Sequence, residues 1–372
     1  MFCVSPDFDH PTVSAGLRRT LSGLALALLV LMRVGGDAAA QSQTAPAAAT
    51  SATSAKRLSG VKSWGYQLQK VKPAEIAASP YDLVVVDYSR NGTDGGRFTP
   101  ADVKTMQTKP DGGRRIVLAY MSIGEAEDYR FYWNPAWVEK APLRSPSAYV
   151  NTPLSPPPGA APSPEGVAPA VPAPDTVRIP RLTAPGWLGR ENEAWPGNYL
   201  VRYWYEGWYD LIIYETGSYL ERIQQAGFDG VYVDRVDVFY ALEGDRANAA
   251  SLMVDFVVAL AAKARSRNPQ FIVMPQNGEE LVKDARYLGV IDGIAKEDLF
   301  FGAEQAGAMN SLSAITSSVA GLAVVKAAGL PVFTVEYLED AGQAAKAAAE
   351  MKAAGFITYI GPRRLDRLAS PR

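Results

Sequence analysis

Acidic side chains follow apolar segments at several places in this chain. In the stretch GFDGVYVDRVDVFY (Gly227–Tyr240), the apolar residues Val231 to Val233 are followed at once by Asp234. Desolvating a carboxylate at the end of a buried strand is unfavourable unless the charge has a partner or a chemical role. The sequence therefore first raises the question of what Asp234 does.

The same pattern recurs at the ends of other apolar segments. The polar residues found there are Asp87, Tyr88, Tyr120, Ser122, Glu125, Gln276, Asn277, Glu297, Glu336 and Tyr337. Gathering several carboxylates is unfavourable for folding alone. Two carboxyl groups on either side of a scissile bond are, by contrast, what glycoside hydrolysis requires. The pattern therefore favours a glycosidase site.

Each acidic residue also has a structural interpretation. Asp87 and Asp234 could cap free N–H groups at the start of a following helix. Glu297 could be the ion partner of Lys296 or Arg235. The joint occurrence of these acids is more informative than any one of them.

Eight apolar segments must position these side chains. Helical stretches lie between some of them, around residues 208–226, 246–267, 307–328 and 340–354. The predicted strands are Trp64–Leu68, Leu83–Tyr88, Ile116–Met121, Gly230–Asp234, Phe271–Gln276, Gly293–Glu297, Pro331–Tyr337 and Phe356–Ile360. Apolar strands with helical crossovers are typical of parallel sheets. Eight such units predict an α/β fold, the (β/α)8 TIM barrel, in which the carboxyl ends of the strands face the active site.

Some features of this architecture stay open. The segment Tyr199–Trp204 would make a ninth strand, and we place it in the long loop after the third strand. A doubly wound open sheet is the alternative fold. Gly227, Gly329 and Gly355 follow predicted helices, where a glycine commonly ends a helix.

The N-terminus carries a pattern typical of a targeting segment. An apolar run from Leu21 to Met32 is preceded by Arg18 and Arg19 and followed by small residues up to Ala40. This pattern predicts a signal peptide over residues 1–40. The run is shorter than the about 20 residues needed to span a bilayer. We expect a secreted or periplasmic protein without stable membrane insertion after cleavage; an uncut membrane anchor is the alternative.

Cleavage would change the chemistry that is available. The only cysteine, Cys3, and the only histidine, His10, both lie inside the predicted signal peptide. Disulfides, Cys/His metal sites and Ser/His or Cys/His nucleophile pairs are then excluded from the mature chain. We expect no metal and no other cofactor, so acid–base chemistry must come from Asp, Glu, Tyr or Lys.

Composition indicates an ordinary globular protein, and the length allows one large domain or two small ones. The chain is 48% hydrophobic and 20% charged, with a net charge of -2 and no Lys/Arg-rich run, which argues against nucleic acid as a partner. Residues 41–60 predict a disordered lead-in, and residues 61–372 a single domain. The Pro/Ala-rich tract 141–185 is interpreted as a loop insertion in that domain. The reason is that eight strands are reached only when the segments before and after the tract belong to one barrel.

Aromatic residues and further acids surround this tract. The rings are Tyr129, Tyr132, Trp133, Trp137, Trp187, Trp195, Tyr199, Tyr203, Trp204, Tyr205 and Trp208. Flat rings can stack on sugar faces, or they can simply pack a long loop against the barrel. The acidic run Glu125–Asp128 could likewise serve only the first turn of a helix.

Several segments resemble glycoside hydrolase family 114, the endo-α-1,4-polygalactosaminidase group. The segment YMSIGEAEDYRFYW (Tyr120–Trp133) is the most specific of them. The shorter blocks follow in the family's order and are Tyr66–Gln69, Gly227–Asp234, Pro275–Leu281, Val335–Leu338 and Phe356–Leu368. The resemblance covers Ser63 to Leu368, apart from the Pro/Ala-rich tract.

The resemblance implies a retaining hydrolase of α-1,4-linked galactosamine-containing polysaccharide. It places the catalytic acids at Asp234, as nucleophile, and Glu297, as general acid/base; Leu299 and Phe300 are expected to favour the protonated form of Glu297. The expected substrate-binding residues are Asp87, Tyr88, Tyr120, Ser122, Glu125, Arg235, Asn277, Glu336 and Tyr337. The expected partner is the polysaccharide alone, bound by a monomer. The alternatives are a non-catalytic carbohydrate-binding barrel and a hydrolase of another α-linked glycan.

Overall fold

The computed structural model describes residues 57–142, 176–303, 305 and 307–370. The predicted signal peptide, most of the predicted lead-in and the centre of the Pro/Ala-rich tract lie outside the described residues. The described chain begins with a turn in which Leu58 is buried. In the same turn, Arg57 Nη1 lies 2.5 Å from Asp292 Oδ1. Packing therefore starts a few residues before position 61.

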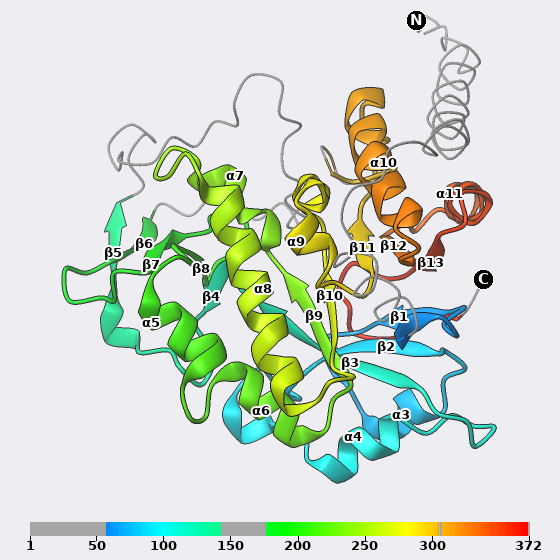
Figure 1. Ribbon diagram of the computed structural model, residues 1–372, viewed down its shortest axis with the longest axis horizontal. Helices are drawn as coiled ribbons and strands as arrows, with labels where there is room; N and C mark the ends of the chain where they lie inside the picture. The colour runs from blue at the N-terminus through cyan, green and yellow to red at the C-terminus, as the bar shows by residue number, and fades with distance from the viewer. Residues whose placement is uncertain (1–56, 143–175, 304, 306, 371–372) are drawn as a thin grey trace, which may run out of the picture.

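In the part of the chain that the structure describes, eight parallel strands form two sheets (Figure 1). The five-stranded sheet has the order β1-β2-β3-β9-β10, with β1 (Trp64–Tyr66), β2 (Leu83–Asp87), β3 (Ile116–Ser122), β9 (Gly230–Asp234) and β10 (Ile272–Pro275). The three-stranded sheet has the order β11-β12-β13, with β11 (Ile294–Glu297), β12 (Val332–Glu336) and β13 (Ile357–Ile360). All the predicted strands are present with ends within one or two residues of the expected ones, and the predicted α/β class is confirmed.

The hydrogen-bonded ladders do not close these strands into one barrel. A single parallel bridge, Gln276 with Ala295, joins β10 to β11, and in the described part of the chain no ladder joins β13 to β1. The backbone of Asn277, at φ 60, turns the chain away directly after that bridge. The strand order is also sequential, without the reversal that a doubly wound sheet requires.

Side chains from both sheets meet around one buried ring. Trp64 of β1 lies 6.2 Å from Tyr232 of β9, 5.6 Å from Phe333 of β12 and 5.9 Å from Tyr359 of β13, measured between ring centroids. Aromatic rings at these separations pack favourably when they are offset or edge-on. The two sheets therefore share one interior, although among the described residues only one bridge joins their edges.

The longer helices pack on the sheets from outside (Figure 1). They are α4 (Pro100–Met106), α6 (Tyr219–Ala226), α8 (Ala249–Arg267), α10 (Leu312–Ala327) and α11 (Ala341–Ala353), and the short ones are α3 (Pro73–Ala77), α5 (Glu206–Tyr209), α7 (Phe239–Leu242) and α9 (Ala285–Leu288). Gly227, Gly329 and Gly355 follow helices with φ of 87, 76 and 74°, which confirms their predicted role. Among the described residues, no helix is both long and apolar enough to cross a bilayer.

One predicted helix is broken into pieces. The stretch 208–226 contains the end of α5, a π-helical turn over Asp210–Tyr214, and α6. The break follows from the extended backbone of Glu215 and the left-handed Gly217, at φ 79. The prediction of one continuous helix was therefore wrong.

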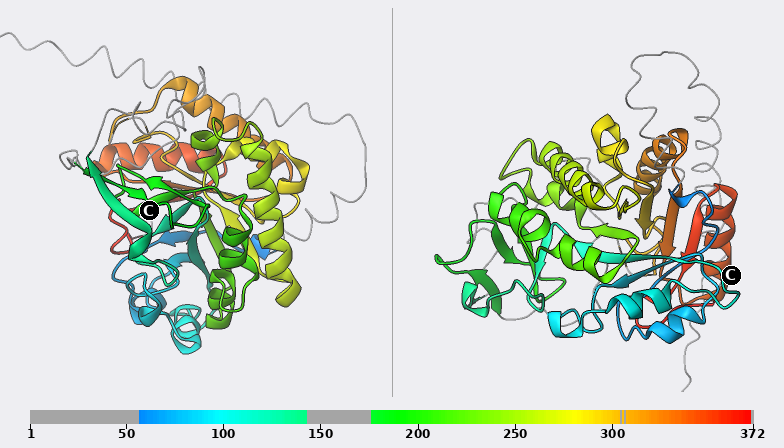
Figure 2. Two further views of the ribbon diagram at one scale, coloured as in Figure 1. Left: turned by 90° about the vertical axis from the view of Figure 1, so that its left-hand side faces the viewer. Right: turned by 60° about the horizontal axis from the view of Figure 1, so that its bottom comes forward.

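The chain between β3 and β9 forms a separate group of antiparallel strands. These are β4 (Glu125–Glu127), β5 (Val138–Pro142), β6 (Thr176–Pro180), β7 (Leu188–Glu191) and β8 (Asn198–Val201). They extend to one side of the parallel sheets (Figure 2). The predicted ninth strand is β8, and it pairs with β4 and β7 rather than joining the parallel sheets. β3 and β9 pair directly, with Ser122 opposite Asp234.

Candidate active site

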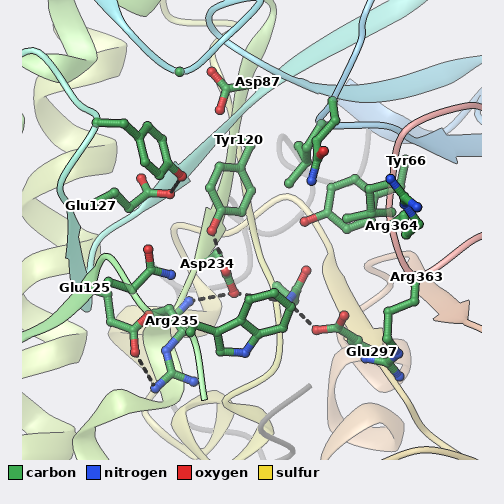
Figure 3. Close-up of a pocket in the computed structure, with 18 of the residues that line it drawn as sticks. Tyr66, Asp87, Tyr120, Glu125, Glu127, Asp234, Arg235, Glu297, Arg363 and Arg364 are labelled. Carbon is green, nitrogen blue, oxygen red and sulfur yellow. Dashed lines mark hydrogen bonds and ion pairs between the residues drawn. The ribbon is translucent and has the colours of Figure 1, made fainter. Parts of the chain in front are cut away.

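A cavity of about 570 Å³ opens at the carboxyl ends of β1, β2, β3, β9, β10 and β11 (Figure 3). The predicted site residues that line it are Asp87, Tyr120, Glu125, Asp234, Arg235, Asn277 and Glu297. They are far apart in the sequence, and parallel strands bring them to one edge of the fold.

Two predicted residues after β2 and on β3 do not line the cavity. Tyr88 is fully buried, and its ring packs edge-on at 5.0 Å from that of Tyr219. Ser122 is buried as well, and its Oγ accepts a hydrogen bond from the Glu125 N–H at 3.3 Å. Successive side chains of a strand point to opposite faces. Because Asp87 faces the cavity, its neighbour Tyr88 faces away.

Two predicted residues at the end of β12 lie behind the cavity wall. Glu336 is fully buried, and its Oε1 accepts a hydrogen bond from the Phe300 N–H at 2.7 Å. Tyr337 lies near Glu297, and its ring packs on the guanidinium of Arg363. Glu336 therefore holds the loop after β11, and Tyr337 packs on a basic residue of the cavity lining.

The two predicted catalytic acids are bridged by one amide. Gln276 Nε2 donates to Asp234 Oδ1 at 3.0 Å and to Glu297 Oε2 at 2.7 Å. The two oxygens therefore lie no more than about 5.7 Å apart, close enough for both acids to reach the same scissile bond. Gln276 was recognised in the sequence as a strand-end residue without an assigned role.

Asp234 is held by two further donors. The Tyr120 hydroxyl donates to its Oδ2 at 2.7 Å, and the backbone N–H of Arg235 donates to its Oδ1 at 2.8 Å. Burial raises the pKa of Asp234 to about 6, although the Tyr120 hydrogen bond opposes this rise. The Arg235 guanidinium binds Glu125 at 3.0 Å, and its charge also lowers the pKa of Asp234.

Glu297 has the higher proton affinity of the two acids. Burial raises its pKa to about 8, and the neighbouring carboxylates of Asp298 and Asp234 add to the rise. Leu299 and Phe300, two and three positions after it, are buried in the core. Near neutral pH, the two acids therefore favour different protonation states, which is the arrangement that separates an acid from a base.

Three successive strands end with the same backbone feature. The cavity residue at the end of β9, β10 and β11 is followed in each case by a residue in the left-handed region, namely Arg235 at φ 60, Asn277 at φ 60 and Asp298 at φ 51. Residues other than glycine adopt this region at a cost, and such residues cluster at functional sites. The turn takes the chain out of the sheet as soon as the cavity residue has been placed.

A buried arginine holds two carboxylates in the cavity wall. The Arg130 side chain is fully buried, with Nη2 at 2.9 Å from Asp87 Oδ2 and Nε at 2.6 Å from Glu127 Oε2. The Tyr129 hydroxyl also donates to Glu127. Asp87, Glu127 and Tyr129 line the cavity. The search for polar residues at strand ends identified Asp87. It missed Glu127 and Arg130, which lie in the segment after β3.

The aromatic residues divide between packing and the cavity. Trp133 packs on Tyr199 at 4.5 Å, and Trp187 packs on Trp208 at 4.8 Å. Trp195 is 39% exposed and lines the cavity, as the half-exposed Tyr129 does. Both sequence interpretations therefore apply, each to a different set of rings.

The opposite side of the cavity is lined by Arg363, Arg364 and Leu365 from the segment after β13. Arg363 Nη2 donates to both carboxylate oxygens of Asp298 at 2.7 Å, and its guanidinium lies 4.4 Å from the Tyr337 ring centroid. These arginines were missed as site residues because they follow no strand pattern.

Known proteins resemble this chain over most of its length. A protein of Thermotoga maritima with no characterised function is 36% identical over 244 residues, which is 64% of this chain and 60% of that protein. A similarly uncharacterised protein of Deinococcus radiodurans is 32% identical over 314 residues, 84% of this chain and 83% of the relative.

A solved structure shares the fold. The glycoside hydrolase domain of PelA from Pseudomonas aeruginosa matches with a TM-score of 0.54 and 18% identity, covering 84% of this chain and 99% of that domain. The sequence model of glycoside hydrolase family GH114 matches residues 175–370, which include Asp234, Gln276 and Glu297. The chain therefore belongs to glycoside hydrolase family GH114.

Proposed function

We propose that this chain is a retaining glycoside hydrolase that cleaves α-1,4-linked galactosamine-containing polysaccharide with Asp234 and Glu297. The observation that carries the proposal is the bridge of Gln276 between the two acids. The resulting limit of about 5.7 Å between their oxygens suits the about 5–5.5 Å of retaining enzymes and is shorter than the about 6.5–9.5 Å of inverting ones.

In the first step, the ionised Asp234 attacks the anomeric carbon and forms a glycosyl ester. Glu297 donates its proton to the departing glycosidic oxygen, so the leaving sugar departs as a neutral alcohol. The Tyr120 hydroxyl and the Arg235 N–H keep the attacking carboxylate oriented. The pKa values of about 6 and about 8 support this division of roles.

In the second step, water replaces the leaving sugar. Glu297, now ionised, accepts a proton from the water. The oxygen of that water attacks the anomeric carbon, and the ester bond to Asp234 breaks. Two inversions at the same carbon restore the original configuration, and both carboxyl groups return to their starting protonation states.

The family membership supports the choice of glycan, and the charge of the cavity agrees with it. Asp87, Glu125 and Glu127 line one side of the cavity and supply carboxylates for a cationic amino sugar. We further propose that the two sheets represent an incompletely hydrogen-bonded (β/α)8 barrel, because their strands follow in cyclic order around Trp64. Secretion is proposed from the apolar run before Ala40.

The test is incubation of the purified protein with partially deacetylated α-1,4-galactosaminogalactan, with sizing of the products and NMR of the first anomer released. We expect shorter chains with α-anomeric ends. Glu297→Gln should lower kcat at least about a hundredfold, and Asp234→Asn at least as much. Glu75→Gln, at an exposed pair with Lys72, is the matched control and should leave kcat unchanged.

Three outcomes would contradict the proposal. Binding of the glycan without cleavage would indicate a carbohydrate-binding barrel. Cleavage only of a different α-linked glycan would overturn the choice of substrate. Full activity in both Asp234→Asn and Glu297→Gln would overturn the site.

A further inference from the structure

The cavity carries opposite charges on its two sides. In Figure 3, Glu125 and Glu127 lie on the side of Asp234, whereas Arg363 and Arg364 lie on the side of Glu297. The contacts agree with this view. Glu125 is bound to Arg235, the residue after Asp234, and Arg363 is bound to Asp298, the residue after Glu297.

The acidic side keeps an excess of carboxylates. Asp87 and Glu127 share the single guanidinium of Arg130. Glu125 and Asp237 share that of Arg235, at 3.0 and 3.9 Å. Arg130 and Arg235 therefore each bind two carboxylates that line the cavity.

The other side has an excess of cations. Lys70, Arg364 and Arg367 lie around one carboxylate, Asp366, at 3.5, 3.6 and 3.2 Å. We call these four residues the cationic rim. Its three basic side chains are largely exposed, at 67, 78 and 71%. Lys70 and Arg364 line the cavity, and Arg367 does not.

The positions of the two acids orient a bound chain across this asymmetry. A general acid must contact the oxygen of the leaving sugar, so the leaving sugar lies on the side of Glu297. That is the side of the cationic rim. The sugar that is attacked by Asp234 lies toward the acidic side.

We propose that the two sides of the scissile bond select sugars of different charge: a free-amine sugar on the side of Asp234, and an uncharged N-acylated sugar on the leaving-group side. This inference rests on the proposed function. An ammonium group is attracted by the acidic networks and repelled by the cationic rim. An acyl carbonyl accepts hydrogen bonds from guanidinium and ammonium groups without that repulsion.

The experiment uses the full protein and α-1,4-galactosamine polymer that is randomly and about half N-acetylated. Mass spectrometry of the products reads the sugar on either side of each cut. We expect new reducing ends to be enriched about threefold or more in free amines, and new non-reducing ends in N-acetyl groups. Because the rim is exposed to solvent, its part of the bias should shrink in high salt.

Two variants test whether the bias comes from the basic residue that lines the cavity. Arg364→Glu and Arg367→Glu change the same charge beside Asp366, but only Arg364 lines the cavity. We expect Arg364→Glu to remove or reverse the bias at new non-reducing ends, while Arg367→Glu keeps most of it. Both residues are exposed, so both variants should fold.

The outcomes separate this inference from the proposed function. Cleavage without any bias in the wild-type protein would overturn the inference and leave the hydrolase assignment intact. An equal loss of bias in both variants would overturn the role of Arg364. Absence of cleavage with every degree of acetylation would overturn the proposed function and this inference together.

Discussion

At Asp234 and Glu297, burial and hydrogen bonding act differently on two groups of the same chemistry. Both carboxyl groups are buried, which raises both pKa values. Hydrogen bonds from Tyr120 and the Arg235 N–H stabilise the ionised form of Asp234 and lower its pKa in part. Two neighbouring carboxylates raise the pKa of Glu297 further. One acid is therefore suited to attack and the other to proton donation.

This difference predicts the pH dependence of catalysis. Asp234 must be ionised, so kcat/KM should rise with pH through about 6. Glu297 must be protonated, so kcat/KM should fall through about 8. Initial rates at low substrate concentration between pH 4 and 10 measure both limbs. A maximum below pH 5, or a profile with one limb, would contradict the assigned protonation states.

Asp298→Asn tests the cause of the upper limb. The carboxylate of Asp298 raises the pKa of Glu297, so its removal should move the alkaline limb to lower pH. The change also frees Arg363, whose charge acts in the same direction. Asparagine tolerates the left-handed backbone at this position, so the fold should persist. An alkaline limb that stays in place would show that Asp298 does not contribute to the raised pKa of Glu297.

Single residues show how far the site could be predicted from sequence. Asp234 and Glu297 end strands, and parallel strands bring such ends together, so their proximity was predictable. Tyr88 was wrongly expected to face the same way as Asp87, although the alternation of side chains along a strand opposes it. Arg130 and Arg363 lie in irregular segments, whose positions depend on tertiary contacts that no periodicity encodes.

At the level of elements, the ends of the strands determine the site. β9, β10 and β11 each place a polar side chain and then leave the sheet through Arg235, Asn277 or Asp298 in the left-handed region. The strands themselves were predictable from their apolar runs. The left-handed turns were not, because these positions hold no glycine to indicate them.

Substitutions at Asn277 can separate the contribution of its left-handed backbone to stability from that of its side chain. Its Oδ1 accepts a hydrogen bond from the Glu297 N–H at 3.2 Å, and its backbone is left-handed. Asn277→Gly loses the hydrogen bond and gives the unfolded chain more freedom, whereas Asn277→Ala loses the hydrogen bond and incurs about 1 kcal/mol or more of backbone strain. We expect the melting temperature to fall in the order wild type, Asn277→Gly, Asn277→Ala. Equal melting temperatures for the two variants would show that the turn is unstrained.

At the level of the whole molecule, the order of the parallel strands follows the order of the chain. This order was predictable from eight apolar segments with helical crossovers. The incomplete pairing of the two sheets was not, because it depends on where Asn277 turns. The long excursion between β3 and β9 was identified by its proline content, but its antiparallel strands were not.

The Pro/Ala-rich tract should be dispensable for folding and for catalysis. Pro142 of β5 pairs with Thr176 of β6, so the chain on either side of residues 143–175 lies together. An Asn-Gly turn can close an antiparallel pair with two residues. Replacing 143–175 with Asn-Gly should leave kcat/KM and the melting temperature unchanged, as measured by product release and calorimetry. A lower kcat/KM in the shortened chain would show that the tract contributes to the site.

The direct pairing of β3 with β9 separates the strands that carry the two acids from the antiparallel strands between them. The antiparallel strands between them leave the parallel sheets, whereas α6 packs on those sheets from outside. Glu125 and Glu127 lie on β4, among the antiparallel strands, while Asp234 and Glu297 end parallel strands. Changes in the antiparallel strands therefore alter the carboxylates that line one side of the cavity, while the two acids stay on strands of their own.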